Sequence, residues 1–190
     1  MRPDERQLVL DQLVSSESRL LALIGGLTPA QWSFREAPER WSIAENVEHL
    51  AVFEDFIRQA IASALATTPG ETPGPARLAA IAAKDTLVLS VADARDATFI
   101  ARDATRPVGR WPDPADIVVH LRAARASTIA FVAESDADLR NRFFAHIAFG
   151  DLDCYQWLLL LGRHTHRHAR QIERVMAHPA YPAHPNRSTV

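Results

Sequence analysis

Residues 151–176, DLDCYQWLLLLGRHTHRHARQIERVM, decide the fold because they predict one long amphipathic helix with three histidines near its centre. At the 3.6-residue period of a helix, one face collects apolar residues and two of the histidines. The members of this stripe are Trp157, Leu160, Leu161, His164, His168, Gln171, Ile172 and Val175. Asp151 or Asp153 is the candidate N-cap, and His166 falls on another side, where we expect it to be solvated.

His164 and His168 are four residues apart, which places their rings one turn apart on the same helix face. Such a pair can bind a single metal ion. Because a buried ring nitrogen without a partner costs about 1–3 kcal/mol, a pair among leucines needs either an ion or hydrogen bonds to carbonyls and hydroxyls. The helix alone leaves both interpretations open, and a third ligand from another segment would favour the ion.

The composition predicts a helical protein with one substantial core. The chain has 190 residues, is 47% hydrophobic and contains only seven glycines, so we expect one domain over 1–190 with a tail at 179–190. The formal net charge of −2 argues against a general nucleic-acid binder. The apolar runs are too short to cross a bilayer, and the start MRPDERQ lacks the layout of a signal peptide. We therefore expect a cytoplasmic protein without a membrane or nucleic-acid partner.

Three further long helices are predicted. The first runs from Pro3 to Gly25-Gly26, and the second follows the capping box of Ser42 and Glu45 and continues to about Ala66. The third runs from Asp113 to about Glu134. These helices, with the histidine helix, predict an all-α four-helix bundle with a long crossover between the second and third helices.

The remaining segments are predicted to be shorter or irregular. A short helix begins at Thr28-Pro29, and TTPGETPGP at 67–75 is a turn-rich break. We expect one or two helical turns within 77–95 and irregular chain after them. FFAHIAFGDLD, at 143–153, is expected to be a plain linker.

His49 is the candidate for a third ligand, since it lies beside Leu50 and Phe53 on the apolar face of the second long helix. A lone histidine in such a place is more often a packing residue. It gains weight here because a site between helices needs its third donor from a neighbouring helix.

Other polar residues are weaker candidates. Glu45 and Glu48 flank His49 and could bond a ligand's second nitrogen or act as a general base, although capping or solvent exposure is the favoured interpretation. Cys154 is about 15 Å along the helix from His164 and is expected to be a small apolar residue. Gln171 is either a partner of a ligand or a packing residue. We expect structural roles for His120 and His146, and surface positions for His178 and His184.

WSIAENVEHL at 41–50 and HIAFGDLDCYQWLLLLGRHTHRHARQI at 146–172 resemble the DinB-like superfamily. The resemblance implies a four-helix bundle in which His49, His164 and His168 hold a divalent metal. Nickel and zinc come first, with iron and manganese as alternatives, and dimers are common in the family. Some members are transferases that use low-molecular-weight thiols, and for many no reaction is known.

The residues themselves point to compatible chemistry. Three neutral imidazoles suit zinc, nickel, copper or iron better than magnesium or calcium, and three protein ligands leave a coordination position open. An ion there could lower the pKa of a bound water or thiol. Two functional classes stay open: a metal-dependent enzyme, either a thiol-dependent S-transferase or a hydrolase of small molecules, and a non-catalytic metal-binding or stress-response bundle. No further catalytic residue is identified.

A homodimer is expected from the family resemblance and from two aromatic residues that follow the first long helix. Trp32 and Phe34 lie in a segment that we expect to be exposed, so a partner subunit could cover them.

Overall fold

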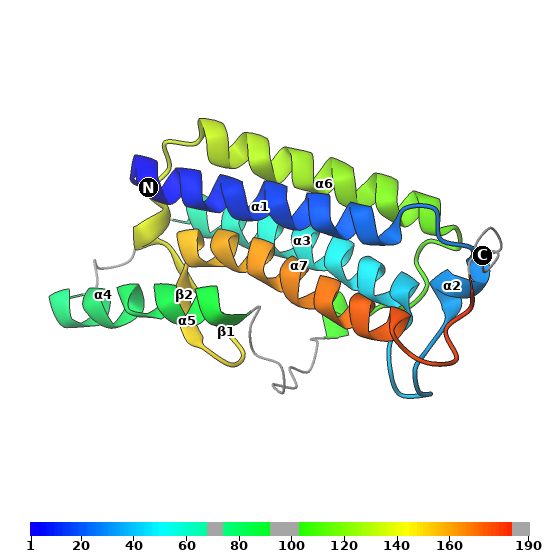
Figure 1. Ribbon diagram of the computed structural model, residues 1–190. Coiled ribbons are helices and arrows are strands. Elements are labelled where there is room, and N and C mark those ends of the chain that lie inside the picture. The colour runs from blue at the N-terminus through cyan, green and yellow to red at the C-terminus, as the bar shows by residue number, and fades with distance from the viewer. Residues whose placement is uncertain (68–73, 92–102, 184–190) are drawn as a thin grey trace.

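Four long helices lie alongside one another and form the body of the protein (Figure 1). The structure is a computed structural model and describes residues 1–67, 74–91 and 103–183. The long helices are α1 (Pro3–Ile24), α3 (Ile43–Ala66), α6 (Pro114–Glu134) and α7 (Cys154–Met176). The shorter elements are α2 (Pro29–Ser33), α4 (Pro75–Ala82), α5 (Lys84–Ser90) and the 3₁₀ turns η2 (Asp103–Thr105) and η3 (Leu139–Asn141). The predicted four-helix bundle is confirmed.

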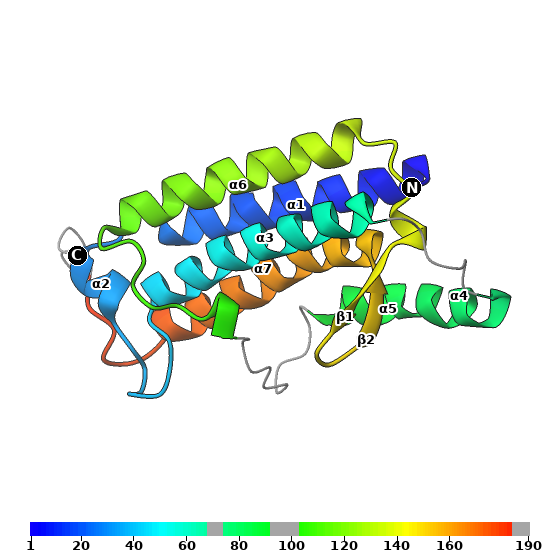
Figure 2. The same ribbon diagram turned by 180° about the vertical axis from the view of Figure 1, so that it is seen from behind.

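The bundle does not have a simple up-and-down order. α1 packs against α6 and α7, and α3 packs against the same two helices. The colour ramp shows that α1 and α7 run in one direction and α3 and α6 in the other (Figures 1 and 2). α3 and α6 are therefore parallel neighbours, and the chain needs the predicted crossover to return to the end of the bundle where both begin.

The helix ends follow the predicted capping signals. Ser42 Oγ accepts a hydrogen bond from the Glu45 amide at 3.2 Å, and the Glu45 carboxylate accepts from the Ser42 amide at 2.8 Å. At the start of α7 the cap is Asp153 rather than Asp151, since its carboxylate accepts from the Gln156 amide at 2.7 Å. α4 and α5 confirm the helical turns expected within 77–95; residues 92–102 lie outside the described part of the chain.

Two expectations from the sequence are wrong. Residues 143–153 are not a plain linker but form an antiparallel hairpin of β1 (Phe143–His146) and β2 (Gly150–Asp153), which is held to α7 by Phe144 stacking on Trp157 at 4.4 Å. Trp32 is 9% exposed and packs into the core near the start of α3. Phe34 is half-buried and meets the Tyr181 ring at 5.5 Å, so these aromatics close the end of the bundle.

A single buried guanidinium connects all four long helices. Arg125 of α6, 1% exposed, donates to the Glu54 carboxylate of α3 at 2.7–3.0 Å. It also donates to the Leu13 carbonyl (2.8 Å) and the Ser16 hydroxyl (3.0 Å) of α1, and to the Thr165 hydroxyl (3.0 Å) of α7. Its five N–H groups are thus all bonded, which is how a buried charge of this kind is tolerated.

None of the helices in the described residues has the length and hydropathy needed to span a membrane.

The close approach of α1 and α7 depends on Gly162. A Cβ at this position would lie 2.7 Å from Cβ of Gln12 and 2.9 Å from the backbone carbon and oxygen of the same residue. A backbone obstacle cannot rotate away, so α1 and α7 would have to move apart.

We predict that Gly162→Ala destabilises the protein although alanine is the better helix former by about 1 kcal/mol. Overpacking commonly costs about 1–3 kcal/mol, and we expect a net loss of about 1–2 kcal/mol in the free energy of unfolding measured by urea denaturation. Gly74→Ala is the control, since no atom lies within 4 Å of its added Cβ. Equal stability of the two variants would contradict this account of the α1–α7 contact.

Candidate metal centre

The three histidines singled out in the sequence meet at one point between α3 and α7. Nε2 of His164 lies 3.3 Å from Nε2 of His49 and 3.2 Å from Nε2 of His168. One nitrogen from each ring falls within 4.8 Å of the others, a grouping that could hold a metal ion. His49 and His168 are 4% and 5% exposed, and His164 is half-buried.

The other ring nitrogens of His49 and His168 are fixed by oxygen acceptors. Nδ1 of His49 lies 2.7 Å from the Thr105 carbonyl, and Nδ1 of His168 lies 2.8 Å from the Asn46 amide oxygen. The orientation of that amide follows from its nitrogen, which donates to the Ser42 carbonyl at 2.9 Å. Since both oxygens only accept, both histidines carry their proton on Nδ1 and present a lone pair on Nε2.

This assignment leaves too few protons for the three converging nitrogens. Only His164 has a proton that could lie among the three Nε2 atoms. That proton can form a full hydrogen bond to Nε2 of His49 or of His168, but not to both. If that proton is on Nδ1 instead, three lone pairs face one another; Nδ1 of His164 is itself buried and has no hydrogen-bond partner among the described residues. A cation at the convergence point would satisfy all three Nε2 atoms, as is usual when histidine ligands are oriented from their other nitrogen.

Burial keeps the three imidazoles neutral. It lowers the pKa of His49 below the ordinary value, and it lowers the pKa of His168 and His164 well below it. For His164 the neighbouring His49 and the positive charge of Arg167 act in the same direction as burial. The three imidazoles are therefore able to coordinate a metal at neutral pH, because a metal binds the neutral ring.

Aromatic side chains pack around the cluster. The Trp41 ring lies nearly parallel to that of His168, with centroids 6.2 Å apart, and contacts His49 at 4.9 Å. The Phe53 ring contacts His164 at 4.3 Å. Both aromatic residues are half-buried, so they restrict the imidazoles while retaining an exposed edge.

Glu48 is neither exposed nor a helix cap, contrary to the interpretation favoured from the sequence. It is 3% exposed, and its carboxylate accepts the backbone N–H groups of Val108, Gly109 and Arg110 at 2.9, 3.0 and 3.2 Å. The Arg110 side chain adds a bond of 2.9 Å. Burial alone would raise the pKa of Glu48, but these donors outweigh it and hold that pKa below its usual value. Glu45 is the capping-box partner of Ser42 at the start of α3, as predicted.

The other candidates lie apart from the cluster. His166 does face away from it, but it is half-buried against α1, 3.5 Å from the Ser15 hydroxyl, rather than fully solvated. His120 bonds Asp55 at 2.6 Å. Nδ1 of His146 accepts two backbone N–H groups of its own turn, at 3.0 and 3.2 Å. These two histidines therefore have the structural contacts that were expected.

The remaining sequence candidates also lie outside the cluster. Cys154 is the buried first residue of α7, and burial raises the pKa of its thiol to about 12. Gln171 and His178 are half-buried, and His184 lies outside the described residues.

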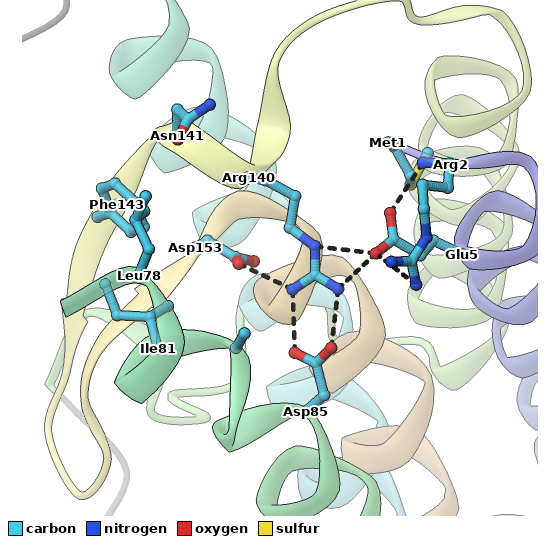
Figure 3. A pocket seen from close by; sticks show the side chains of 11 residues that line it. Met1, Arg2, Glu5, Leu78, Ile81, Asp85, Arg140, Asn141, Phe143 and Asp153 are labelled. Atoms are coloured by element: carbon cyan, nitrogen blue, oxygen red, sulfur yellow. Dashed lines mark hydrogen bonds and ion pairs between the residues drawn. The ribbon is translucent and has the colours of Figure 1, made fainter. Parts of the chain in front are cut away.

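A cavity of about 550 Å³ lies at the other end of α7, where Arg140 is surrounded by carboxylates (Figure 3). Arg140 donates to Glu5 and Asp85 through two nitrogens each and to Asp153 at 2.9 Å, so all five of its N–H groups are used. Asp153 precedes His164 by eleven residues, about 16 Å of helix. Arg140 and its three carboxylates join the starts of α1 and α7 to α5. Because every N–H group of the guanidinium is bonded to a carboxylate, none is left to donate to a ligand.

Comparison with known proteins agrees with the class that the fold defines, a four-helix bundle with an unusual chain order. The model of the DinB superfamily matches residues 12–172, which include all three histidines, and the chain therefore belongs to that superfamily. Among solved structures it is similar to YfiT from Bacillus subtilis, a probable metal-dependent hydrolase with an unusual four-helix bundle topology. The TM-score is 0.59 at 17% identity, over 93% of this chain and 88% of YfiT. No curated protein is similar enough in sequence to match.

The buried histidines predict a dependence of stability on pH in protein kept free of metal by a chelator. The unfolded chain binds protons near pH 6.5, whereas folded His164 and His168 bind them only at lower pH. The free energy of unfolding should therefore fall as the pH drops below about 6.5, by at most about 1.4 kcal/mol per pH unit for each histidine. Denaturant titrations between pH 7.5 and 5 would measure this slope.

The control for this prediction is the double variant His164→Asn, His168→Asn, which should show a shallower slope. Burial raises the pKa of Asp153 to about 6, and this carboxyl acts in the opposite direction in both proteins. The difference between the two proteins therefore isolates the histidines. Parallel slopes would contradict the assignment of buried, neutral rings.

Proposed function

We propose that this protein is a metal-dependent enzyme that binds one divalent transition metal through Nε2 of His49, His164 and His168. The observation that carries the proposal is the convergence of these three nitrogens, two of them with their protons fixed on the opposite side of the ring. An all-imidazole donor set suits nickel, zinc and iron. We propose nickel or zinc first, with iron or manganese as alternatives.

The chemistry we propose is hydrolysis or thiol transfer on a small molecule. Three protein ligands leave a coordination position open, and a metal there would lower the pKa of a bound water or low-molecular-weight thiol so that it becomes a nucleophile at neutral pH. The protein's own part is to keep the ligand rings neutral, to orient two of them from Thr105 and Asn46, and to offer the Trp41 and Phe53 rings to an apolar part of a substrate. The description of YfiT as a probable metal-dependent hydrolase supports this class.

Metal content tests the ligand set. Protein purified without a histidine tag and reconstituted with zinc or nickel should carry about one ion per chain. His168→Ala should lose most of it, because it removes a converging nitrogen. His166→Ala should keep the ion. His166 lies two residues from His168 on the same helix, but its ring faces α1. Elemental analysis after gel filtration makes the comparison, and equal loss in both variants would refute the ligand assignment.

Activity tests separate the two reactions and the non-catalytic alternative. The metal-loaded protein would be assayed against activated esters and amides for hydrolysis, and with a low-molecular-weight thiol and an electrophilic acceptor for transfer. We expect turnover in one assay, lost in His168→Ala and kept in His166→Ala. Stoichiometric metal without turnover in either assay would instead favour a metal-binding or stress-response protein.

We also propose that the protein is a homodimer, which light scattering would test against the 21.1 kDa chain mass.

A further inference from the structure

The segment that supplies the Thr105 carbonyl is fastened to α3 at both of its ends by two adjacent residues. His49 bonds the Thr105 carbonyl at 2.7 Å. Glu48, one residue earlier, accepts the N–H groups of Val108, Gly109 and Arg110. Residues 105–110 thus form a short strap beside the first half of α3.

The strap has no regular structure of its own beyond the 3₁₀ turn that ends at Thr105, and these bonds tie it to α3. Three successive N–H groups can converge on one carboxylate because Gly109 has a φ of +74°, a conformation that side-chain-bearing residues avoid. Arg110 reinforces the arrangement by donating to Glu48 at 2.9 Å and to the Arg106 carbonyl at 2.7 Å. The carboxylate is therefore the fixed point around which the strap is built.

We propose that Glu48 is a positioning residue for the metal centre: by holding the strap, it keeps the Thr105 carbonyl on Nδ1 of His49, so that Nε2 of His49 stays unprotonated and directed at His164. This inference rests on the proposed function for its consequence, metal affinity, but its structural content concerns the His49 tautomer and can be measured without metal. Glu48 is not one of the three proposed metal ligands. It acts through Thr105 and His49.

The test perturbs the contact from both sides. Glu48→Gln removes the charge and half of the acceptor capacity at the same size, and Gly109→Ala strains the strap while leaving Glu48 intact. The controls are Glu45→Gln, which weakens a carboxylate of the same helix that bonds Ser42 and Arg35, and Gly26→Ala, which places alanine at a φ of +73° with no atom within 4 Å of the added Cβ. Each control matches one test variant in chemistry and leaves the strap unchanged.

The first measurement is the tautomer of His49 in metal-free protein, from two-bond ¹H–¹⁵N correlations of the ring. Wild type and both controls should show His49 protonated on Nδ1, whereas Glu48→Gln and Gly109→Ala should populate the Nε2-protonated form. The second is Zn²⁺ affinity by chelator competition, which we expect to fall about 10–100-fold in the two test variants and to stay within about twofold in the controls.

The outcomes are separable. An unchanged His49 tautomer in the variants that fold, or a Zn²⁺ affinity equal to that of the controls, would overturn the role of Glu48. If wild type binds no Zn²⁺, the proposed function fails, and the tautomer measurement still decides whether Glu48 positions His49. Should one test variant not fold, the other addresses the same strap from the opposite side.

Discussion

The guanidinium of Arg125, on α6, is bonded to each of the other three long helices, and the geometry of the bundle depends on it. Its donors reach Glu54, two groups of α1 and the Thr165 hydroxyl, and it is 1% exposed. A buried charge cannot lose a partner without a large cost, so each helix must keep the rotation that presents its acceptor. Thr165 is the neighbour of His164, and the rotation that brings Thr165 to Arg125 therefore also sets the direction of the two histidines of α7. A wholly apolar centre could be as stable, but it would lack the hydrogen bonds that tie the rotation of each helix to its neighbours.

The histidine cluster works against stability in the absence of an ion. Three imidazoles are removed from water, their pKa values are lowered by burial, and two Nε2 lone pairs face a third ring that can satisfy one of them well. Such a local conflict in an otherwise consistent fold is typical of a functional site. The bundle tolerates it because the opposite nitrogens of His49 and His168 are bonded and because Trp41 and Phe53 pack against the rings. Binding of an ion among the three Nε2 atoms would relieve the conflict.

The parts of this architecture that depend on local sequence were predictable, and those that depend on contacts between distant segments were not. The capping box at Ser42 and the i, i+4 spacing of His164 and His168 act within one helix, so periodicity reveals them. His49 looks like a packing residue until α3 is placed beside α7, and only the need of the His164–His168 pair for a third donor, together with the family resemblance, singled it out. Asn46 carried a usable signal, since it lies three residues before His49 and therefore on the same side of α3. Thr105 carried none, because its contribution is a backbone carbonyl that any residue would supply.

Glu48 shows why local patterns mislead at such a site. Beside a capping box and next to an apolar stripe, a glutamate is normally solvated, yet here the approach of residues 108–110 buries it. That approach follows from the topology of the bundle. Because α3 and α6 are parallel, the chain after α3 must return to the end where α3 began before α6 can start (Figure 2). Its last residues before α6 therefore pass the first half of α3, where Glu48 and His49 lie. The unusual order of the helices thus brings a backbone carbonyl to the third histidine, and the crossover serves the site as well as the connection.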